Sequence, residues 1–188
     1  MIKKILIISI ALFFVIEASA QEKKRRNRVT YSFGAGECQG TTMKGVGQMY
    51  GFGYERALWK ERLRFTYQFG YGIYNSKATL SVGKMWFNSY NITPGFDLTL
   101  FTIKNVSLCV GGGGVINKSQ GLVGSDDDIA TDDKPYYFDE KHFGYNYDVA
   151  IRYGDPAGRL FYKLEWITNQ GTKQYTELGG RFIFGIRL

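Results

Sequence analysis

His142 is the only histidine in the sequence, and histidine is the side chain that ordinarily exchanges a proton near neutral pH. It is therefore the first candidate for a general acid or base. Charged residues directly before it place it at the outer end of a predicted strand, where a solvated loop histidine is the expected role. Ser125, Thr131 and Asp139 could supply other parts of a catalytic triad, but their spacing does not require one.

An acidic stretch at residues 124–133 (GSDDDIATDD) offers carboxylate oxygens, the ligands that Ca²⁺ prefers. Counted from Asp126, positions 1, 3 and 5 are Asp, Asp and Ala, and no glycine stands at position 6. The stretch therefore fails the register of an EF-hand loop. A solvated acidic loop is the favoured interpretation, with weak capture of divalent ions as the alternative. No metal site and no cofactor are predicted.

The run GGGGVINKS at residues 111–119 imitates a phosphate-binding loop, because Gly112, Lys118 and Ser119 stand at the spacing of that motif. Asn117 replaces the second glycine, and no helix is expected to follow and offer its N-terminal amides to phosphate. The run is therefore interpreted as a flexible exit from a strand. Its glycines could equally let a neighbouring side chain pack against the backbone.

Cys38 and Cys109 are the only cysteines, too few for a disulfide scaffold and without the spacing of metal ligands. The strand assignment below puts Cys38 near one end of its strand and Cys109 at mid-height. Because cysteines at different heights cannot form a bond, two free thiols are expected.

Eight segments alternate apolar and polar residues, as strands do when the two faces of a sheet meet different environments. In residues 62–74 (RLRFTYQFGYGIY) every odd position is apolar or aromatic, and the even positions include Arg64, Thr66 and Gln68. Residues 78–87 would prolong the third and fourth strands, and a long connection is expected from residue 117 to about residue 137. The apolar rows of the other segments begin at Val29, Tyr50, Tyr90, Val106, Phe143, Leu160 and Leu178.

The connections between these segments are expected to alternate in length. Those after the second, fourth and sixth segments are tight, and those after the first, third, fifth and seventh are longer. Short turns at one end and longer loops at the other are typical of outer-membrane barrels, whose strands need about 9 to 11 residues to cross the hydrocarbon layer. The sequence therefore predicts an all-β fold, an eight-stranded antiparallel up-and-down transmembrane β-barrel.

Composition decides which row faces lipid, because a soluble lipophile-binding barrel has similar periodicity with its apolar row inside. The polar rows mix charges of both signs with small residues, which suits a narrow interior where ion pairs compensate one another. The charged members of these rows are Glu55, Arg64, Asp97, Asp148, Arg152, Lys163, Glu165, Glu177 and Arg181. Tyrosine and tryptophan recur near the ends of the apolar rows, as interfacial girdles require; they are Tyr31, Tyr54, Tyr153 and Trp166. The apolar rows are therefore assigned to lipid.

The N-terminal residues have the pattern of a secretory signal peptide. Lys3 and Lys4 precede an apolar run at residues 5–16, which gives way to the small residues 18–20. Cleavage is expected after Ala20. The apolar run is too short to cross a bilayer as a helix, which needs about 20 residues.

The predicted domain organisation is a signal peptide at residues 1–20, a basic periplasmic tail at 21–28 and the barrel at 29–188. Without the signal peptide, which holds two lysines and one glutamate, the 24 basic and 17 acidic residues of the chain become 22 and 16. Much of the basic excess lies in the tail, and such a run is usually solvated. No nucleic-acid partner is expected for an exported chain.

The alternating rows, the segment SYNITPGFDLTLFTIKNVSLCVGGGG (89–114) and the final RFIFGIRL (181–188) resemble the porin-like outer-membrane β-barrel domain family of Gram-negative envelopes. The resemblance covers nearly all of the mature chain. It implies location in the cell outer membrane, contact with outer-membrane lipid and lipopolysaccharide, and insertion by the barrel-assembly machinery. In that family the machinery reads the last strand, which usually ends in phenylalanine. Here Phe182, Phe184 and Ile186 match the alternate positions, and Leu188 departs from the pattern.

Two enzymes are known on barrels of this size, the lipid A palmitoyltransferase and the lipid A 3-O-deacylase. The deacylase carries a His-x-Ser pair on one strand, a spacing at which two side chains share a face. Here His142 is followed by Phe143 and Gly144, so the nucleophile position is empty.

Eight strands enclose an interior just wide enough for side chains to fill it, so a wide open pore is not expected. The predicted role is non-enzymatic: a structural, surface-interaction or porin-like protein that presents loops to an extracellular partner. The alternatives are an outer-membrane enzyme that modifies lipid A or another acyl lipid, and a soluble periplasmic lipophile-binding barrel.

Overall fold

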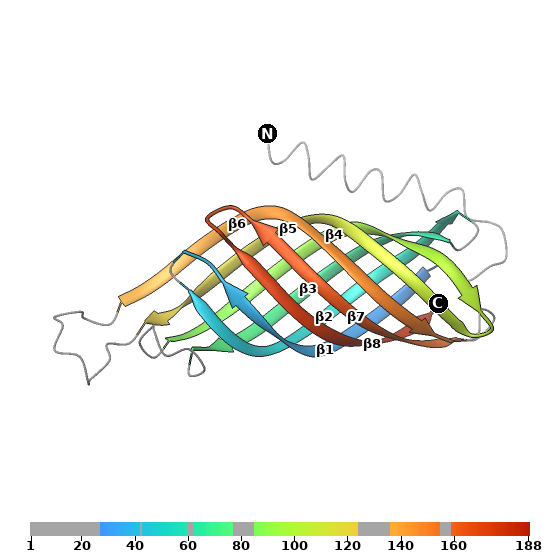
Figure 1. Cartoon of the computed structure of the whole chain (residues 1–188), viewed down its shortest axis with the longest axis horizontal. Helices are drawn as coiled ribbons and strands as arrows, with labels where there is room; N and C mark the ends of the chain where they lie inside the picture. Colours follow the sequence, from blue (N-terminus) through green and yellow to red (C-terminus); the bar gives the residue numbers. More distant parts are fainter. Residues whose placement is uncertain (1–26, 42, 60–61, 77–84, 124–135, 155–158) are drawn as a thin grey trace.

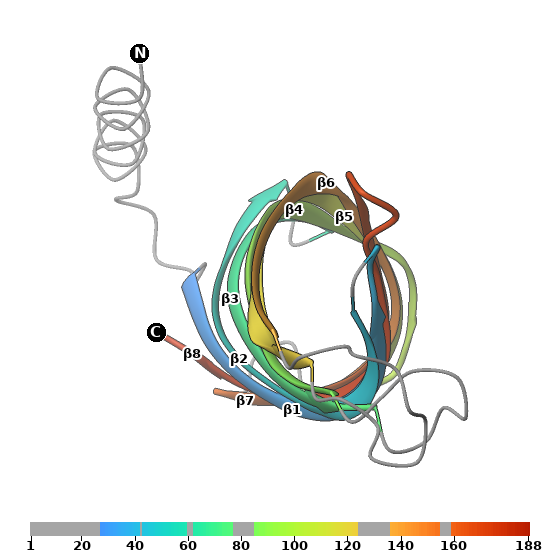
Figure 2. The ribbon, with the colours of Figure 1, turned by 90° about the vertical axis from the view of Figure 1, so that its left-hand side faces the viewer.

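A computed structural model describes residues 27–41, 43–59, 62–76, 85–123, 136–154 and 159–188. Each of its strands pairs antiparallel with the next, and β1 also pairs with β8, so that the sheet closes into a barrel (Figures 1 and 2). The strands are β1 (Asn27–Gln39), β2 (Lys44–Trp59), β3 (Leu63–Asn75), β4 (Met85–Ile103), β5 (Val106–Val123), β6 (Tyr136–Tyr153), β7 (Leu160–Gly171) and β8 (Thr176–Arg187). The predicted fold class is confirmed. Within the described residues, no helix is long and apolar enough to cross a membrane.

The two faces of the wall have the predicted polarity. On β3, Phe69 is 46% exposed on the outside whereas Arg64 is 5% exposed on the inside. The charged residues assigned to the inner rows all face the interior, and large apolar side chains cover the outer wall along all eight strands. A wall that is apolar outside and ionic inside suits lipid around the barrel. It excludes the soluble carrier, which needs the opposite arrangement.

Two of the four aromatic residues assigned to interfacial girdles lie near strand ends. Tyr153 is exposed at the end of β6, and the Tyr54 hydroxyl donates a hydrogen bond over 2.9 Å to Oδ1 of Asn27, the first residue of β1. Tyr31 is exposed but is the fifth of the 13 residues of β1 and pairs with Phe52 in the apolar outer wall, so its assignment to a girdle is not confirmed. Trp166 is also exposed on the outer wall but lies halfway along β7, so its assignment to a girdle is wrong.

The sequence predicted that the fifth strand ends at glycines 111–114, and this prediction is wrong. The strand continues to Val123, and β6 begins at Tyr136, so the connection is shorter than predicted. A Cβ atom at Gly111 would lie 2.2 Å from a carboxylate oxygen of Asp148, and one at Gly113 would lie 2.1 Å from the Pro94 carbonyl oxygen. Gly113 is therefore required by close approach of the neighbouring backbone inside a strand, and Gly111 leaves space for the Asp148 carboxylate; neither marks a turn.

Several other boundaries differ from the predicted ones. β1 begins at Asn27, so Arg28 belongs to the barrel wall, while the expected signal peptide and the preceding tail residues lie outside the described residues. The connections at 40–43 and 172–175 are as short as those at the opposite end. The expected alternation of loop lengths is therefore wrong for these two connections. Residues 85–87 do prolong β4, whereas 77–84 and most of the acidic stretch lie outside the described residues.

Phe69 offers a test of the assignment of the two faces. It pairs with Phe52 and Ile92 on the neighbouring strands, within the apolar outer wall. We predict that Phe69→Arg lowers the free energy of unfolding by about 2 to 4 kcal/mol, the cost of a cation near the bilayer midplane. Phe69→Leu keeps the site apolar and should change little. Urea unfolding in lipid vesicles measures both, and equal stabilities would contradict the assignment.

Candidate functional site

The inward side chains form two groups that differ in chemistry. One group, here called the ionic cluster, consists of buried cations and anions in equal number. Its members are Arg28, Glu55, Asp97, Asp148, Arg152, Lys163, Glu165 and Arg181. The other group also lies inside the barrel, near the β7–β8 connection, and is held mainly by hydrogen bonds. It is called the outer cluster because it lies toward the end of the barrel opposite Asn27 and Arg187. Its members are Tyr74, Asn91, His142, Asn169, Tyr175 and Glu177.

Lys163 is the centre of the ionic cluster. Its Nζ atom lies 2.7 Å from Glu165 Oε1, 3.0 Å from Asp97 Oδ2 and 3.6 Å from Asp148 Oδ1, and its side chain is 1% exposed. Asp148 reaches this position because Gly111, its partner on β5, has no side chain to occupy the space. One ammonium group therefore contacts carboxylates that come from three strands, and arginines supply further positive charge to two of them.

Two arginines extend the cluster toward β1 and β2. Arg152 Nη2 donates to Asp97 Oδ2 over 2.9 Å and lies 3.8 Å from Glu55 Oε2. Arg28 Nη1 lies 3.8 Å from the same oxygen of Glu55. The Phe161 ring is fully buried between them, with its centroid 5.1 Å from Arg28 Cζ and 5.6 Å from Arg152 Cζ, close enough for cation–π attraction.

Arg181 extends the cluster in the other direction. Its Nε atom donates to Glu165 Oε2 over 2.9 Å, and its Nη2 atom contacts the same oxygen and donates to Gln68 Oε1 over 2.8 Å. Arg64, which we expected beside an acidic partner, donates instead to the Thr99 hydroxyl over 3.1 Å. The sequence thus identified the charged members of this cluster except Arg28, which was assigned to the basic tail, but not how they pair.

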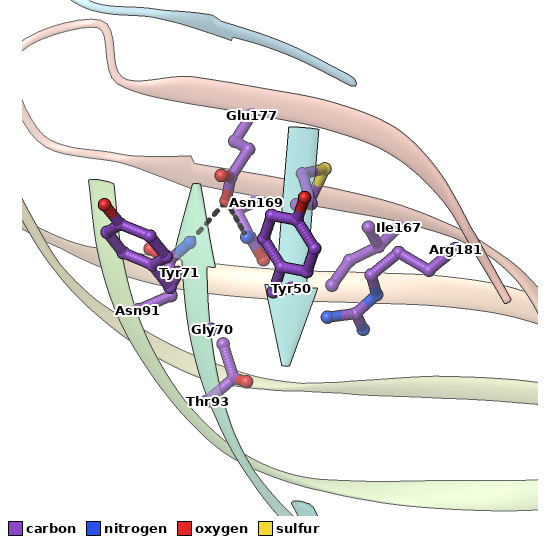
Figure 3. Close-up of a pocket in the computed structure, with 10 residues that line it drawn as sticks. Tyr50, Gly70, Tyr71, Asn91, Thr93, Ile167, Asn169, Glu177 and Arg181 are labelled. Atoms are coloured by element: carbon purple, nitrogen blue, oxygen red, sulfur yellow. Dashed lines mark hydrogen bonds between the residues drawn. The ribbon is translucent and has the colours of Figure 1, made fainter. Parts of the chain in front are cut away.

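Glu177 is the acceptor on which the outer cluster converges (Figure 3). It accepts hydrogen bonds from Asn91 Nδ2 at 2.6 Å, Asn169 Nδ2 at 2.7 Å and the Tyr175 hydroxyl at 3.0 Å, and from the Tyr74 hydroxyl. Burial, and then the Glu177 carboxylate, raise the pKa of Tyr175 well above its ordinary value, so its hydroxyl remains a donor. A fully buried carboxylate is satisfied here by neutral donors from four parts of the wall.

His142 belongs to this cluster and is not the solvated loop residue that we expected. It is fully buried and stacks on Tyr175 with 4.8 Å between ring centroids. Its Nε2 atom lies 3.3 Å from Glu140 Oε2, and its Nδ1 atom lies 3.0 Å from the Thr172 carbonyl oxygen. The prediction was wrong because β6 begins at Tyr136, which places His142 within the strand and on its inner row.

The other residues considered for catalysis do not assemble around His142 within the described part of the chain. Asp139 is on the outer wall, where it forms an ion pair with Lys118 over 3.1 Å. Ser125 and Thr131 lie outside the described residues. The residues that imitate a phosphate-binding loop do not converge either, because Ser119 is buried inside the barrel while Lys118 is on the outer wall. These residues are part of β5, not of a loop.

The remaining space between the two clusters is small. A cavity lined by Asn91, Asn169, Glu177 and Arg181 has a volume of about 10 Å³ (Figure 3), which is about the space of one water molecule. Cys38 and Cys109 are free thiols, as predicted, and both are fully buried. Over the described residues, no group of three or more His, Cys, Asp or Glu side chains is placed to hold a metal ion.

Comparison with known proteins relates the chain to small outer-membrane barrels. No protein-family model and no curated protein matches the sequence. Among solved structures, Neisserial surface protein A has a TM-score of 0.63 at 12% identity over 86% of this chain and 97% of that chain. Ail of Yersinia pestis has a TM-score of 0.52 at 10% identity over 86% and 98%. The outer membrane enzyme PagL has a TM-score of 0.50 at 13% identity over 86% and 99%.

Identities this low establish a shared fold and do not transfer an activity. The fold is that of a small eight-stranded outer-membrane barrel, and the outer wall is apolar on every strand. A closed barrel satisfies all its backbone hydrogen bonds internally, which the hydrocarbon layer requires. The chain is therefore a transmembrane β-barrel of the outer membrane.

Lys163→Met tests the central ion pair. The change leaves Asp97, Asp148 and Glu165 facing one another without their shared cation. We predict a loss of about 3 to 5 kcal/mol in the free energy of unfolding, as for other buried pairs that lose one partner. The matched control is Lys44→Gln, which breaks a half-exposed pair with Glu37 at 3.9 Å and should cost at most about 1 kcal/mol.

A second variant separates lost charge balance from lost packing. Adding Asp148→Asn to Lys163→Met removes a carboxylate whose ion pair, among the described residues, is with Lys163 alone, and should recover part of the stability. Unfolding in urea, followed by heat-modifiable migration on detergent gels, measures each variant. If Lys163→Met unfolds at the same urea concentration as the parent protein, the ionic cluster does not stabilise the barrel.

Proposed function

We propose that this chain is a closed envelope barrel that acts through its outer wall and its loops, and that it does not conduct solutes. The observation that carries the proposal is the filled interior. An ion crossing the barrel would have to separate Lys163 and Arg181 from Glu165 while passing between the side chains of the outer cluster. Each such separation leaves buried charge unpaired, which costs several kcal/mol.

A second candidate role, an enzyme that modifies acyl lipids, fits the structure less well. Such an enzyme needs a base and a nucleophile that reach the lipid around the barrel. His142 faces inward and is covered by Tyr175, and position 144, next on its face of the strand, is glycine. PagL shares the fold, but one fold carries many activities.

The partners we propose follow from the same outer surfaces. Outer-membrane lipid and lipopolysaccharide would surround the apolar belt, and the barrel-assembly machinery would read the outer row of β8, which includes Phe182, Phe184 and Ile186. The loops would face an extracellular partner. Ail has been crystallised in complex with the heparin analogue sucrose octasulfate, which supports the idea that a barrel of this fold can hold an anionic sugar.

Conductance in planar lipid bilayers tests the proposal. We predict that folded protein inserts without sustained current steps, because both clusters obstruct the interior. A wide porin inserted into the same bilayers is the control for detection. Insertion itself is verified by heat-modifiable migration of protein recovered from vesicles of the same lipids. Reproducible open-channel currents from the folded protein would contradict a closed barrel.

A further inference from the structure

The outer wall of β4, β5 and β6 changes character in steps toward the end of the barrel opposite Asn27 and Arg187, which is the extracellular end for a chain with the predicted periplasmic tail. Residues of these three strands pair directly with one another, so they form rungs across the wall. From the membrane outward, the four rungs are Ile92–Ile116–Phe143, Tyr90–Lys118–Lys141, Asn88–Gln120–Asp139 and Trp86–Leu122–Tyr137. The wall therefore offers an apolar rung, then a cationic rung, then a polar rung, then a second apolar and aromatic rung.

The cationic rung lies directly above the lipid belt. The outer row of β6 is apolar or aromatic from residue 143 to 153, and the outer row of β5 is apolar or glycine from 106 to 116. Each of these rows has the length that a tilted strand needs to cross the hydrocarbon layer, about 9 to 11 residues. Lys118 and Lys141, the next outer residues of each strand, therefore stand at the level of the lipid headgroups.

Lys118 and Lys141 are directly opposite each other in the β5–β6 ladder. Side chains in such pairs start about 4.5 to 5.5 Å apart, and like charges there destabilise the sheet. Asp139 compensates one of them, because its Oδ2 atom lies 3.1 Å from Lys118 Nζ. Among the described residues, Lys141 forms no ion pair. An anion placed between the lysines would remove the repulsion.

We propose that this wall binds a phosphorylated glycolipid of the outer leaflet. Its acyl chains would cover the apolar rung of Ile92, Ile116 and Phe143, and its phosphate would lie between Lys118 and Lys141. This inference rests on the proposed function, since it names a lipid partner for the outer wall on which that function depends.

The two rungs above the lysines favour a sugar headgroup over that of a simple phospholipid. Asn88 and Gln120 offer amides that can donate and accept hydrogen bonds with sugar hydroxyls. Above them, Trp86 is 65% exposed and Tyr137 is 59% exposed, and aromatic side chains of this kind combine an apolar body with a polar group. A headgroup that ended at the phosphate would leave both of these rungs uncovered.

Retention of defined lipids by the purified protein tests the proposal. The full chain is folded in detergent and incubated separately with lipid A, with dephosphorylated lipid A and with phosphatidylglycerol. The lipid that stays bound is measured by native mass spectrometry. We expect lipid A to be retained best, and we expect retention to fall about fivefold for each of Lys118→Gln and Lys141→Gln, the effect of about 1 kcal/mol per cation near an anionic surface.

The matched control is Lys44→Gln, which removes a lysine of similar exposure that already pairs with Glu37. This variant should retain lipid A as the parent protein does. Trp86→Ala should lower retention of lipid A but not of phosphatidylglycerol, because only lipid A has a sugar to cover the uppermost rung. Heat-modifiable migration verifies that each variant is folded.

Two results would overturn the proposal. Unchanged retention of lipid A by the Lys118→Gln, Lys141→Gln double variant would mean that the lysines do not bind its phosphate. Equal retention of lipid A and phosphatidylglycerol would show that the wall does not recognise the sugar headgroup. Neither result bears on conductance. A barrel that does not conduct and shows no lipid preference would leave the proposed function intact. A barrel that conducts but retains lipid A would refute the proposed function and leave the lipid site intact.

Thermal unfolding provides a second test, because the difference in stability between variant and parent should depend on whether lipid A is present. In zwitterionic detergent without lipid A, Lys141→Gln should be as stable as the parent protein or more stable, because it relieves the repulsion and leaves the Lys118–Asp139 ion pair in place. With lipid A added, the parent protein should gain stability that the variant does not. A parent protein that gains nothing from lipid A would contradict a phosphate between the lysines.

Discussion

The structure depends on the pairing of charges inside a barrel too narrow to hydrate them. A cation or anion buried alone costs several kcal/mol, so each inward charge needs either an opposite charge or hydrogen-bonding partners in the interior. Lys163 meets this requirement by contacting carboxylates from β4, β6 and β7 at once. Of these partners, Asp97 lies on β4, which is not a neighbour of β7 in the sheet, so its contact with Lys163 crosses the interior and requires the sheet to curve into a barrel.

The same requirement explains features that look unrelated along the chain. Gly111 has no side chain because Asp148 needs its place beside Lys163. Phe161 is an aromatic residue on a polar row because it packs between two guanidinium groups. With the charged side chains gathered inside, the outer wall is left apolar for lipid, and the ends of the strands remain available for contacts with headgroups and surface partners.

Alternation in the sequence predicts the two faces well because a strand offers its side chains only two directions. Arg64, Asp97 and Arg152 were assigned to the polar rows on this ground, the composition of those rows placed them inside, and they are inside. Strand ends were harder to predict. Glycines 111–114 resemble a turn until Asp148 and Pro94 are known to be their neighbours, and that knowledge requires the register of β5 against β6 and β4.

His142 shows how one boundary changes the interpretation of a residue. It shares even parity with Asn146 and Arg152, so extending the strand to Tyr136 turns it inward without further information. The partners of individual charges could not be predicted, because pairs such as Arg152 with Asp97 join distant strands across the interior. The sequence also did not predict that Lys118 and Lys141 are neighbours on the outer wall, because they meet only through the β5–β6 register.

Hydrogen exchange at the charged side chains would test the closed, ion-paired interior most directly. Nitrogen-15 NMR of the protein in lipid nanodiscs resolves the side-chain N–H groups of lysine and arginine. If Lys163 and Arg181 are held by carboxylates away from water, their N–H protons exchange far more slowly than those of the half-exposed Lys44. Exchange at Lys163 as fast as at Lys44 would reveal a hydrated interior and would contradict a closed barrel.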